Sequence, residues 1–195
     1  CDDHPPHDMK AGQAFIAAIY KMLTSNLEQW QKTLFIITYD EHGSFYDHVK
    51  PPVVQEDERA EFRQLGFRVP SLVIGPYVKK NYVSHVQYDH VSFLSTVTRR
   101  LGLTPLNRRV AAANDVRDCI DLNAVETSKF PSAPVGLRSV SLSESQVHES
   151  IRESLGQSEL ADLHYGGPAT LEQKRRGTDQ LLAALDRVGV ARIGR

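Results

Sequence analysis

The chain is 195 residues long, with 23 basic residues, 24 acidic residues and a net charge of −1 at pH 7. Its length and its 41% hydrophobic residues are enough for a buried core, and its near-neutral charge gives no electrostatic case for nucleic acid or an acidic membrane surface as a partner. No window of about 18 apolar residues occurs, so the sequence predicts no transmembrane segment.

The N-terminal segment reads CDDHPPHD and starts with Cys1 rather than Met. We therefore expect a cut end, at which the lack of a visible signal peptide says little about compartment. Cys1 and Cys119 do not have the spacing of metal ligands, and two alternatives stay open for them: a disulfide bridge or two free thiols.

The first elements alternate between helix and strand. Apolar residues at three- and four-residue steps predict a helix that starts after Asp8 and ends near residues 24–26. Two short apolar runs, 33–39 and 69–74, predict strands, the first of them buried on both faces, and a capping Asp89 starts a further helix that ends at Gly102. This order predicts an α/β fold around a parallel sheet.

Beyond about residue 125 the composition changes. We predict a domain over residues 1–125, a linker over 126–145 that is rich in Ser and Pro, and a helical C-terminal extension over 146–195. Helical patterns occur near 146–155 and 171–188. We interpret the second as a packing extension, and the alternative is a helix that lies on a membrane surface. The packing extension is preferred because the polar face of this helix mixes acidic and basic residues.

Two adjacent carboxylates, Asp40 and Glu41, come directly after the predicted strand 33–39, where α/β proteins place their sites. Such close like charges repel, a bound divalent cation removes the conflict, and carboxylate oxygens suit such ions. Neighbours on a strand point to opposite faces, so both residues can bind one metal only if the chain turns, which Gly43 favours. The alternative is a solvated acidic pair.

Histidines gather in the same two places as the acids. His4 and His7 lie in the N-terminal segment, and His42 and His48 follow the acidic pair. Clusters of histidine beside acids favour metal or phosphate chemistry over a purely structural role. His90 comes just after a predicted helix cap, so we interpret it as structural.

The segment TLFIITYDEHGSFYDHVKPP, residues 33–52, resembles the signature of the phosphoesterase family that contains bacterial and plant non-specific phospholipases C and a related acid phosphatase. Three flanking pieces resemble the family in the same order. They are DDHPPHD with the helix start Gly12-Gln13-Ala14-Phe15, the stretch FRVPSLVIGPYVKKNYVSHVQYDHVSFL, and LNRRVAAANDV. The resemblance covers about residues 1–121.

The resemblance implies an alkaline-phosphatase-like α/β fold in which Asp40 and Glu41 ligate one catalytic divalent metal ion, of unknown identity. It implies that His4 contacts the phosphoryl group. The implied reaction is attack by a metal-activated Ser or Thr hydroxyl on phosphorus, giving a phospho-enzyme that water hydrolyses. The substrate is a phosphate ester, either a phospholipid or a small soluble ester, and family members are commonly periplasmic or secreted.

The family's remaining ligands, a Glu-Asn pair and the nucleophile, precede the region that Cys1 matches. We therefore expect the 195-residue chain alone to be inactive or nearly so, with the N-terminal half of the domain missing. The alternative function is a truncated, non-catalytic metal-binding or interaction module. Ser44 stands where the family usually has a second glycine, so a positive φ there would cost about 1 kcal/mol. Oligomeric state stays open.

Overall fold

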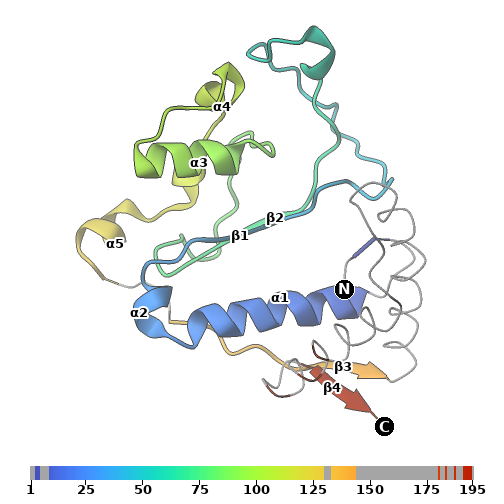
Figure 1. Ribbon diagram of the computed structural model, residues 1–195, viewed down its shortest axis with the longest axis vertical. Helices are drawn as coiled ribbons and strands as arrows, with labels where there is room; N and C mark the ends of the chain where they lie inside the picture. The colour runs from blue at the N-terminus through green and yellow to red at the C-terminus, as the bar shows by residue number, and fades with distance from the viewer. Residues whose placement is uncertain are drawn as a thin grey trace. The chain divides into compact units, whose positions relative to one another are not determined.

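The computed structural model describes residues 3–4, 9–129, 133–143, 180, 183, 187 and 191–194 (Figure 1). The chain forms two compact units, one from residues 1–29 with 135–195 and one from residues 30–134, and each is described by itself. This division follows contacts and differs from the boundaries predicted at residues 125 and 145, which stay predictions. The predicted helix 146–155, nearly all of 171–188, and Cys1, His7 and Asp8 lie outside the described residues.

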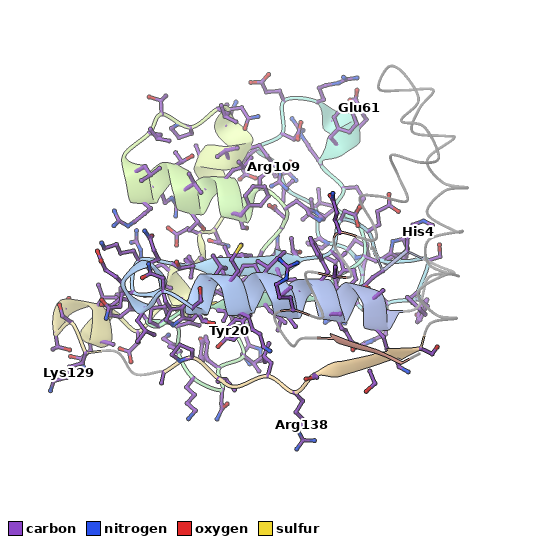
Figure 2. All side chains as sticks on the ribbon, turned by 60° about the horizontal axis from the view of Figure 1, so that its bottom comes forward. His4, Tyr20, Glu61, Arg109, Lys129 and Arg138 are labelled. Atoms are coloured by element: carbon purple, nitrogen blue, oxygen red, sulfur yellow. The ribbon has the colours of Figure 1, made fainter. Side chains whose placement is uncertain are left out.

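In the first unit, helix α1 (Met9–Thr24) ends where the sequence predicts. The buried residues are Ala11, Gly12, Ala14, Ala17 and Tyr20, whereas Phe15 and Met22 are exposed. The face of small side chains is buried because it allows close approach by other segments. A larger residue of the same face, Tyr20 (Figure 2), accepts a hydrogen bond on its hydroxyl from the Val135 amide at 2.7 Å.

The same unit holds a pair of strands that the sequence analysis did not predict. Strand β3 (Val140–Ser143) pairs in parallel with β4 (Ala191–Gly194), and α1 lies against β3. The pair joins the end of the predicted linker to the end of the predicted extension. No local pattern marked it, because pairing between distant segments depends on the whole fold rather than on either segment.

The boundary between the units falls within the short helix α2 (Leu27–Trp30), whose Gln29 amide donates to the Asn26 side chain and whose last residue, Trp30, is the first of the second unit. Strands β1 (Phe35–Thr38) and β2 (Ser71–Ile74) follow within two residues of their predicted starts. They pair antiparallel, with Phe35 opposite Ile74 and Thr38 opposite Ser71, so the predicted parallel pairing of these two strands is wrong.

The connection between the two strands explains their direction. A parallel pair needs a crossover, usually an α-helix, but residues 39–70 fold back and contain only the 3-10 helix η1 (Ala60–Phe62). Both strands are only partly buried, so the burial on both faces that was predicted for the first strand is wrong. An apolar run indicates that a segment is extended, and it does not encode which neighbour it pairs with or in which direction.

One of the helices after β2 was predicted from the sequence. Helix α3 (Ser92–Leu101) ends at Gly102 in the left-handed conformation, as predicted (Figure 1). Asp89 was predicted to cap this helix, but the residue at the cap position is Val91. The Asp89 carboxylate accepts a hydrogen bond from the Val91 amide at 2.9 Å, just before the helix begins. Helix α4 (Arg108–Ala112), the 3-10 helix η2 (Val116–Cys119) and α5 (Leu122–Glu126) each begin with a side-chain cap, from Asn107, Asp115 and Asp121.

These elements enclose the core of the second unit. Val110 and Val116 are buried against α3, and the fully buried Ser95 hydroxyl donates to the Ala113 carbonyl at 2.8 Å. Cys119 is a free, buried thiol, and burial raises the pKa of that thiol above its ordinary value. Within the described part of the chain, no helix is both long and apolar enough to cross a membrane.

Candidate functional site

The acidic pair lies at the turn that follows β1. The Glu41 amide donates to the Asp40 carboxylate at 3.0 Å, and both side chains are exposed. The chain turns just beyond the pair, with Gly43 at φ 64° and Ser44 at φ 63°. Ser44 adopts the left-handed conformation that the sequence analysis identified as strained, at a cost of about 1 kcal/mol.

Two contacts fix where this turn leaves the strand pair. The Tyr39 amide donates to the Pro70 carbonyl at 3.3 Å, which continues the β1–β2 ladder by one residue. The Tyr39 carbonyl lies 2.9 Å from His90 Nε2, and because a carbonyl can only accept, Nε2 carries the proton. His90 thus joins the segment before α3 to the base of the turn, in agreement with its predicted structural role.

An ion pair between Asp47 and Arg68, which we call the Asp47–Arg68 lock, closes the long loop that follows the turn. The Asp47 carboxylate accepts hydrogen bonds from the amides of Val49 and Arg68 and a two-pronged ion pair from the Arg68 guanidinium, at 2.8 Å and 2.7 Å. The Arg68 guanidinium, together with the Val49 amide, holds the pKa of Asp47 far below its ordinary value. The sequence analysis missed this pair because nothing local links two residues so far apart in the chain.

The histidines near the acids have different surroundings. His42 is half-buried and packs against the Phe67 ring, with ring centroids 4.9 Å apart. His48 has a side chain that is 82% exposed, with Nδ1 3.9 Å from Asp47 Oδ1. His42 therefore contributes to holding the turn against residues 67–68, whereas His48 lies in solvent.

His4 belongs to the first unit, and its side chain is exposed (Figure 2). Its neighbour Asp3 lies directly on Gly12 of α1, where a Cβ would overlap the Asp3 carboxylate. Glycine at position 12 is therefore what lets the segment that carries His4 lie against the helix. The acidic pair belongs to the second unit, so the structure does not test the joint role predicted for His4, Asp40 and Glu41.

Several other carboxylates of the second unit are engaged in hydrogen bonds or ion pairs, and four of them bind side chains distant in sequence. Asp89 pairs with Arg109 at 2.5 Å, and Asp115 pairs with Arg99 at 2.9 Å. Asp118 accepts from the hydroxyls of Ser84 and Tyr82, which lower the pKa of its carboxyl. Asp47, described above, is the fourth. By contrast, no basic side chain among the described residues forms an ion pair with Asp40 or Glu41.

The donor set of the acidic pair suits a hard divalent cation, because it consists of exposed carboxylate oxygens beside a turn. Among the described residues, no group of three or more His, Cys, Asp or Glu side chains is arranged to hold a metal ion. Asp40 and Glu41 therefore fit two ligand positions, and further ligands would have to come from elsewhere.

Comparison with known proteins places these residues in a wider context. A family model described as "Phosphoesterase family" matches residues 1–104. The chain is 35% identical over 175 residues to non-specific phospholipase C4 of Arabidopsis thaliana, covering 79% of this chain and 32% of that protein. It is 34% identical over 119 residues to phospholipase C B of Mycobacterium tuberculosis (strain ATCC 25618 / H37Rv), covering 52% of this chain and 23% of that protein. The chain thus spans about a third or less of these curated relatives.

Proposed function

Because the chain belongs to the Phosphoesterase family, we propose that it carries part of the site of a metal-dependent hydrolase of phosphate esters. Asp40 and Glu41 are its ligands for one divalent metal ion. The single observation that supports this most directly is the open acidic pair at the turn after β1, within the matched residues 1–104. Its carboxylates are exposed and have no ion pair with a described basic residue, so they can receive a cation.

The roles of the chain's own residues follow from their chemistry. Asp40 and Glu41 bind the cation through carboxylate oxygens, and the turn at Gly43 and Ser44 lets both approach it. His4 binds the phosphoryl group or donates a proton to the leaving oxygen. When bound, the metal neutralises negative charge on the phosphoryl oxygens and activates the nucleophile. In this proposal the nucleophile is a Ser or Thr hydroxyl outside residues 1–195.

The substrate class is proposed from the relatives. Relatives from a plant and from a bacterium carry the name phospholipase C, so the proposed substrate is a phospholipid, with a small phosphate ester of the acid-phosphatase kind as the alternative within this function. A periplasmic or secreted location is proposed with it, since the resemblance implies an exported enzyme.

A second function is favoured by a different observation. The described residues contain no group of three or more His, Cys, Asp or Glu side chains that could hold a metal ion. A module that binds a metal ion or a partner without turnover would need no more than the acidic pair. In that case the chain would show metal affinity and no hydrolysis in any form.

The test is turnover of p-nitrophenyl phosphodiester and phosphomonoester substrates, with and without EDTA. The 195-residue chain is compared with a longer version that carries residues upstream of Cys1. We expect chelator-sensitive turnover in the longer version and little or none in the chain alone. The double variant Asp40→Asn/Glu41→Gln of the longer version should lose this turnover. No chelator-sensitive turnover in either version would reject the hydrolase and favour the metal-binding module.

A further inference from the structure

The stretch that contains α3, α4 and the turn between them is positively charged, although the net charge of the whole chain is −1. Residues 90–114 contain four arginines and no acidic residue. The same stretch exposes large apolar side chains on α3 and on the turn that follows it. We call this surface the α3–α4 patch, and it consists of Phe93, Val97, Leu101, Leu103 and Leu106 with Arg100 and Arg108.

The apolar residues of α3 lie on one face of the helix. Phe93, Val97 and Leu101 follow each other at four-residue steps, which places them in a row. All three are exposed, and Leu101 is 63% exposed. On the other side of the helix, Ser92 and Ser95 are buried. The side of α3 that faces its own unit is therefore formed by small polar residues, and the apolar side faces outward.

The turn after α3 exposes further apolar side chains directly beyond this helix. Gly102 ends the helix in a left-handed conformation, and the chain then exposes two leucines before α4, with Leu103 at 54% and Leu106 at 79%. Isolated exposed leucines are ordinary, but a row that continues from a helix face into a turn marks a surface that binds something apolar.

The arginines of this stretch divide into two kinds. Arg99 is paired with Asp115, and Arg109 with Asp89, so both hold the fold. Arg100 and Arg108 are exposed, and neither has an acidic partner among the described residues. Arg100 lies on the same side of α3 as Phe93, since seven residues make almost two full turns. The apolar row is therefore flanked by two uncompensated positive charges, one at the end of α3 and one at the start of α4.

We propose that the α3–α4 patch docks this chain on the surface of a membrane that contains anionic phospholipids. Leucines that enter the boundary between headgroups and acyl chains, with arginines at the level of the phosphates, are how interfacial segments bind such membranes. A positive, acid-free patch is complementary to an anionic surface. The inference rests on the proposed function only for the choice of a phospholipid surface over another anionic partner.

The experiment is co-sedimentation of the full 195-residue chain with vesicles, in the absence of any substrate assay. Vesicles of phosphatidylcholine alone are compared with vesicles in which a third of the lipid is phosphatidylserine. We expect the chain to bind the anionic vesicles and to be released as salt is raised, because screening weakens attraction between surface charges. Equal binding to both vesicle types, or binding that does not depend on salt, would overturn the proposal.

Two double variants assign the binding to the patch. Arg100→Gln/Arg108→Gln should weaken binding by about 25-fold, from about fivefold for each arginine near an anionic surface. Leu103→Glu/Leu106→Glu should weaken it at least as much. The matched controls are Lys80→Gln and Leu122→Glu, which change an exposed lysine and a leucine that is 52% exposed elsewhere in the same unit. Both controls should bind like the unchanged chain.

All variants change exposed side chains, and circular dichroism checks that they fold. Unchanged binding of the two patch variants would overturn the proposal, as would a concentration-dependent dimer that only these variants lose, since the patch would then be covered by a second copy of the chain. Vesicle binding is measured without turnover, so its failure and a failure of the hydrolysis assay are separate results.

Discussion

Two groups of carboxylates in the second unit differ in what surrounds them. In the first group each carboxylate accepts hydrogen bonds or an ion pair from a side chain distant in sequence. Its members are Asp47, Asp89, Asp115 and Asp118. In the second group, Asp40 and Glu41 are exposed, and among the described residues the Asp40 carboxylate accepts only from the adjacent Glu41 amide.

The difference separates acids that hold the fold from acids that are available for a ligand. A carboxylate whose oxygens already accept several hydrogen bonds has little capacity left for a cation, and its surroundings favour the charged form. An exposed pair with no basic partner keeps that capacity. Both groups consist of carboxylates and differ in their surroundings, so substitution should affect stability in the first group and metal binding in the second.

The largest expected effect is on metal binding. The isosteric double variant Asp40→Asn/Glu41→Gln should lower affinity for Mn²⁺ or Ca²⁺ by more than about a hundredfold, since even outer groups of a metal site are worth about 10–100-fold. Its free energy of unfolding should change by less than about 0.5 kcal/mol, as for other exposed substitutions. Isothermal titration with each ion measures the affinity.

The matched control for this prediction is Glu58→Gln/Glu126→Gln, which removes two exposed carboxylates elsewhere in the unit. The control should keep the affinity of the unchanged chain. If both double variants bind the ions equally well, Asp40 and Glu41 are solvated acids and the comparison fails.

An intermediate effect is expected at Asp89 and Arg109, whose side chains are only 13% and 12% exposed. Arg109→Met should lower the free energy of unfolding by about 2 kcal/mol, because it leaves a largely buried carboxylate without its partner. Urea unfolding followed by the fluorescence of Trp30 measures this, since Trp30 is buried in the same unit and is the chain's one tryptophan.

The double variant Asp89→Asn/Arg109→Met tests the cause of that loss. It removes the unpaired charge and should recover part of the lost stability. A double variant less stable than the two single changes added together would contradict the pairing.

The smallest expected effect is the pH dependence that Asp47 contributes. The pKa of Asp47 lies below its ordinary value of 3.8 in the folded chain. Its ion pair therefore stabilises the fold fully above about pH 4, and this contribution is lost as the pH falls through the folded pKa. Asp47→Asn should be less stable than the unchanged chain at pH 7, and the difference should shrink toward pH 2.

Urea midpoints at pH 7, 5 and 3 measure that difference, with Glu58→Gln as the control whose exposed carboxylate has no ion pair. A difference between Asp47→Asn and the unchanged chain that grows as the pH falls would show that the sign is wrong.

Local features of the fold could be predicted from the sequence because their causes are local. The end of α3 follows from Gly102, and the turn after β1 follows from Gly43 beside a strand rich in β-branched residues. The strain at Ser44 was predictable for the same reason, since a positive φ restricts one residue at a time.

Features that depend on distant partners could not be predicted. The antiparallel direction of β1 and β2, the β3–β4 pair and the Asp47–Arg68 lock each join segments far apart in the chain. In the candidate site, the sequence identified the exposed acids and the turn that holds them. The metal and the role of His4 stay predictions, because they require groups that the described residues do not assemble.

The Asp47–Arg68 lock also has a consequence for how chain length can vary. It closes the loop at its base, and a single bridge between Val53 and Gln64 follows further out, so the segment around η1 projects from the unit (Figure 1). Residues added near Asp57–Glu61 would lengthen only the projecting end, and the cost of a longer closed loop rises slowly with its length. The lock thus makes this loop the natural place for evolution, or an engineer, to insert a peptide without disturbing the acidic turn.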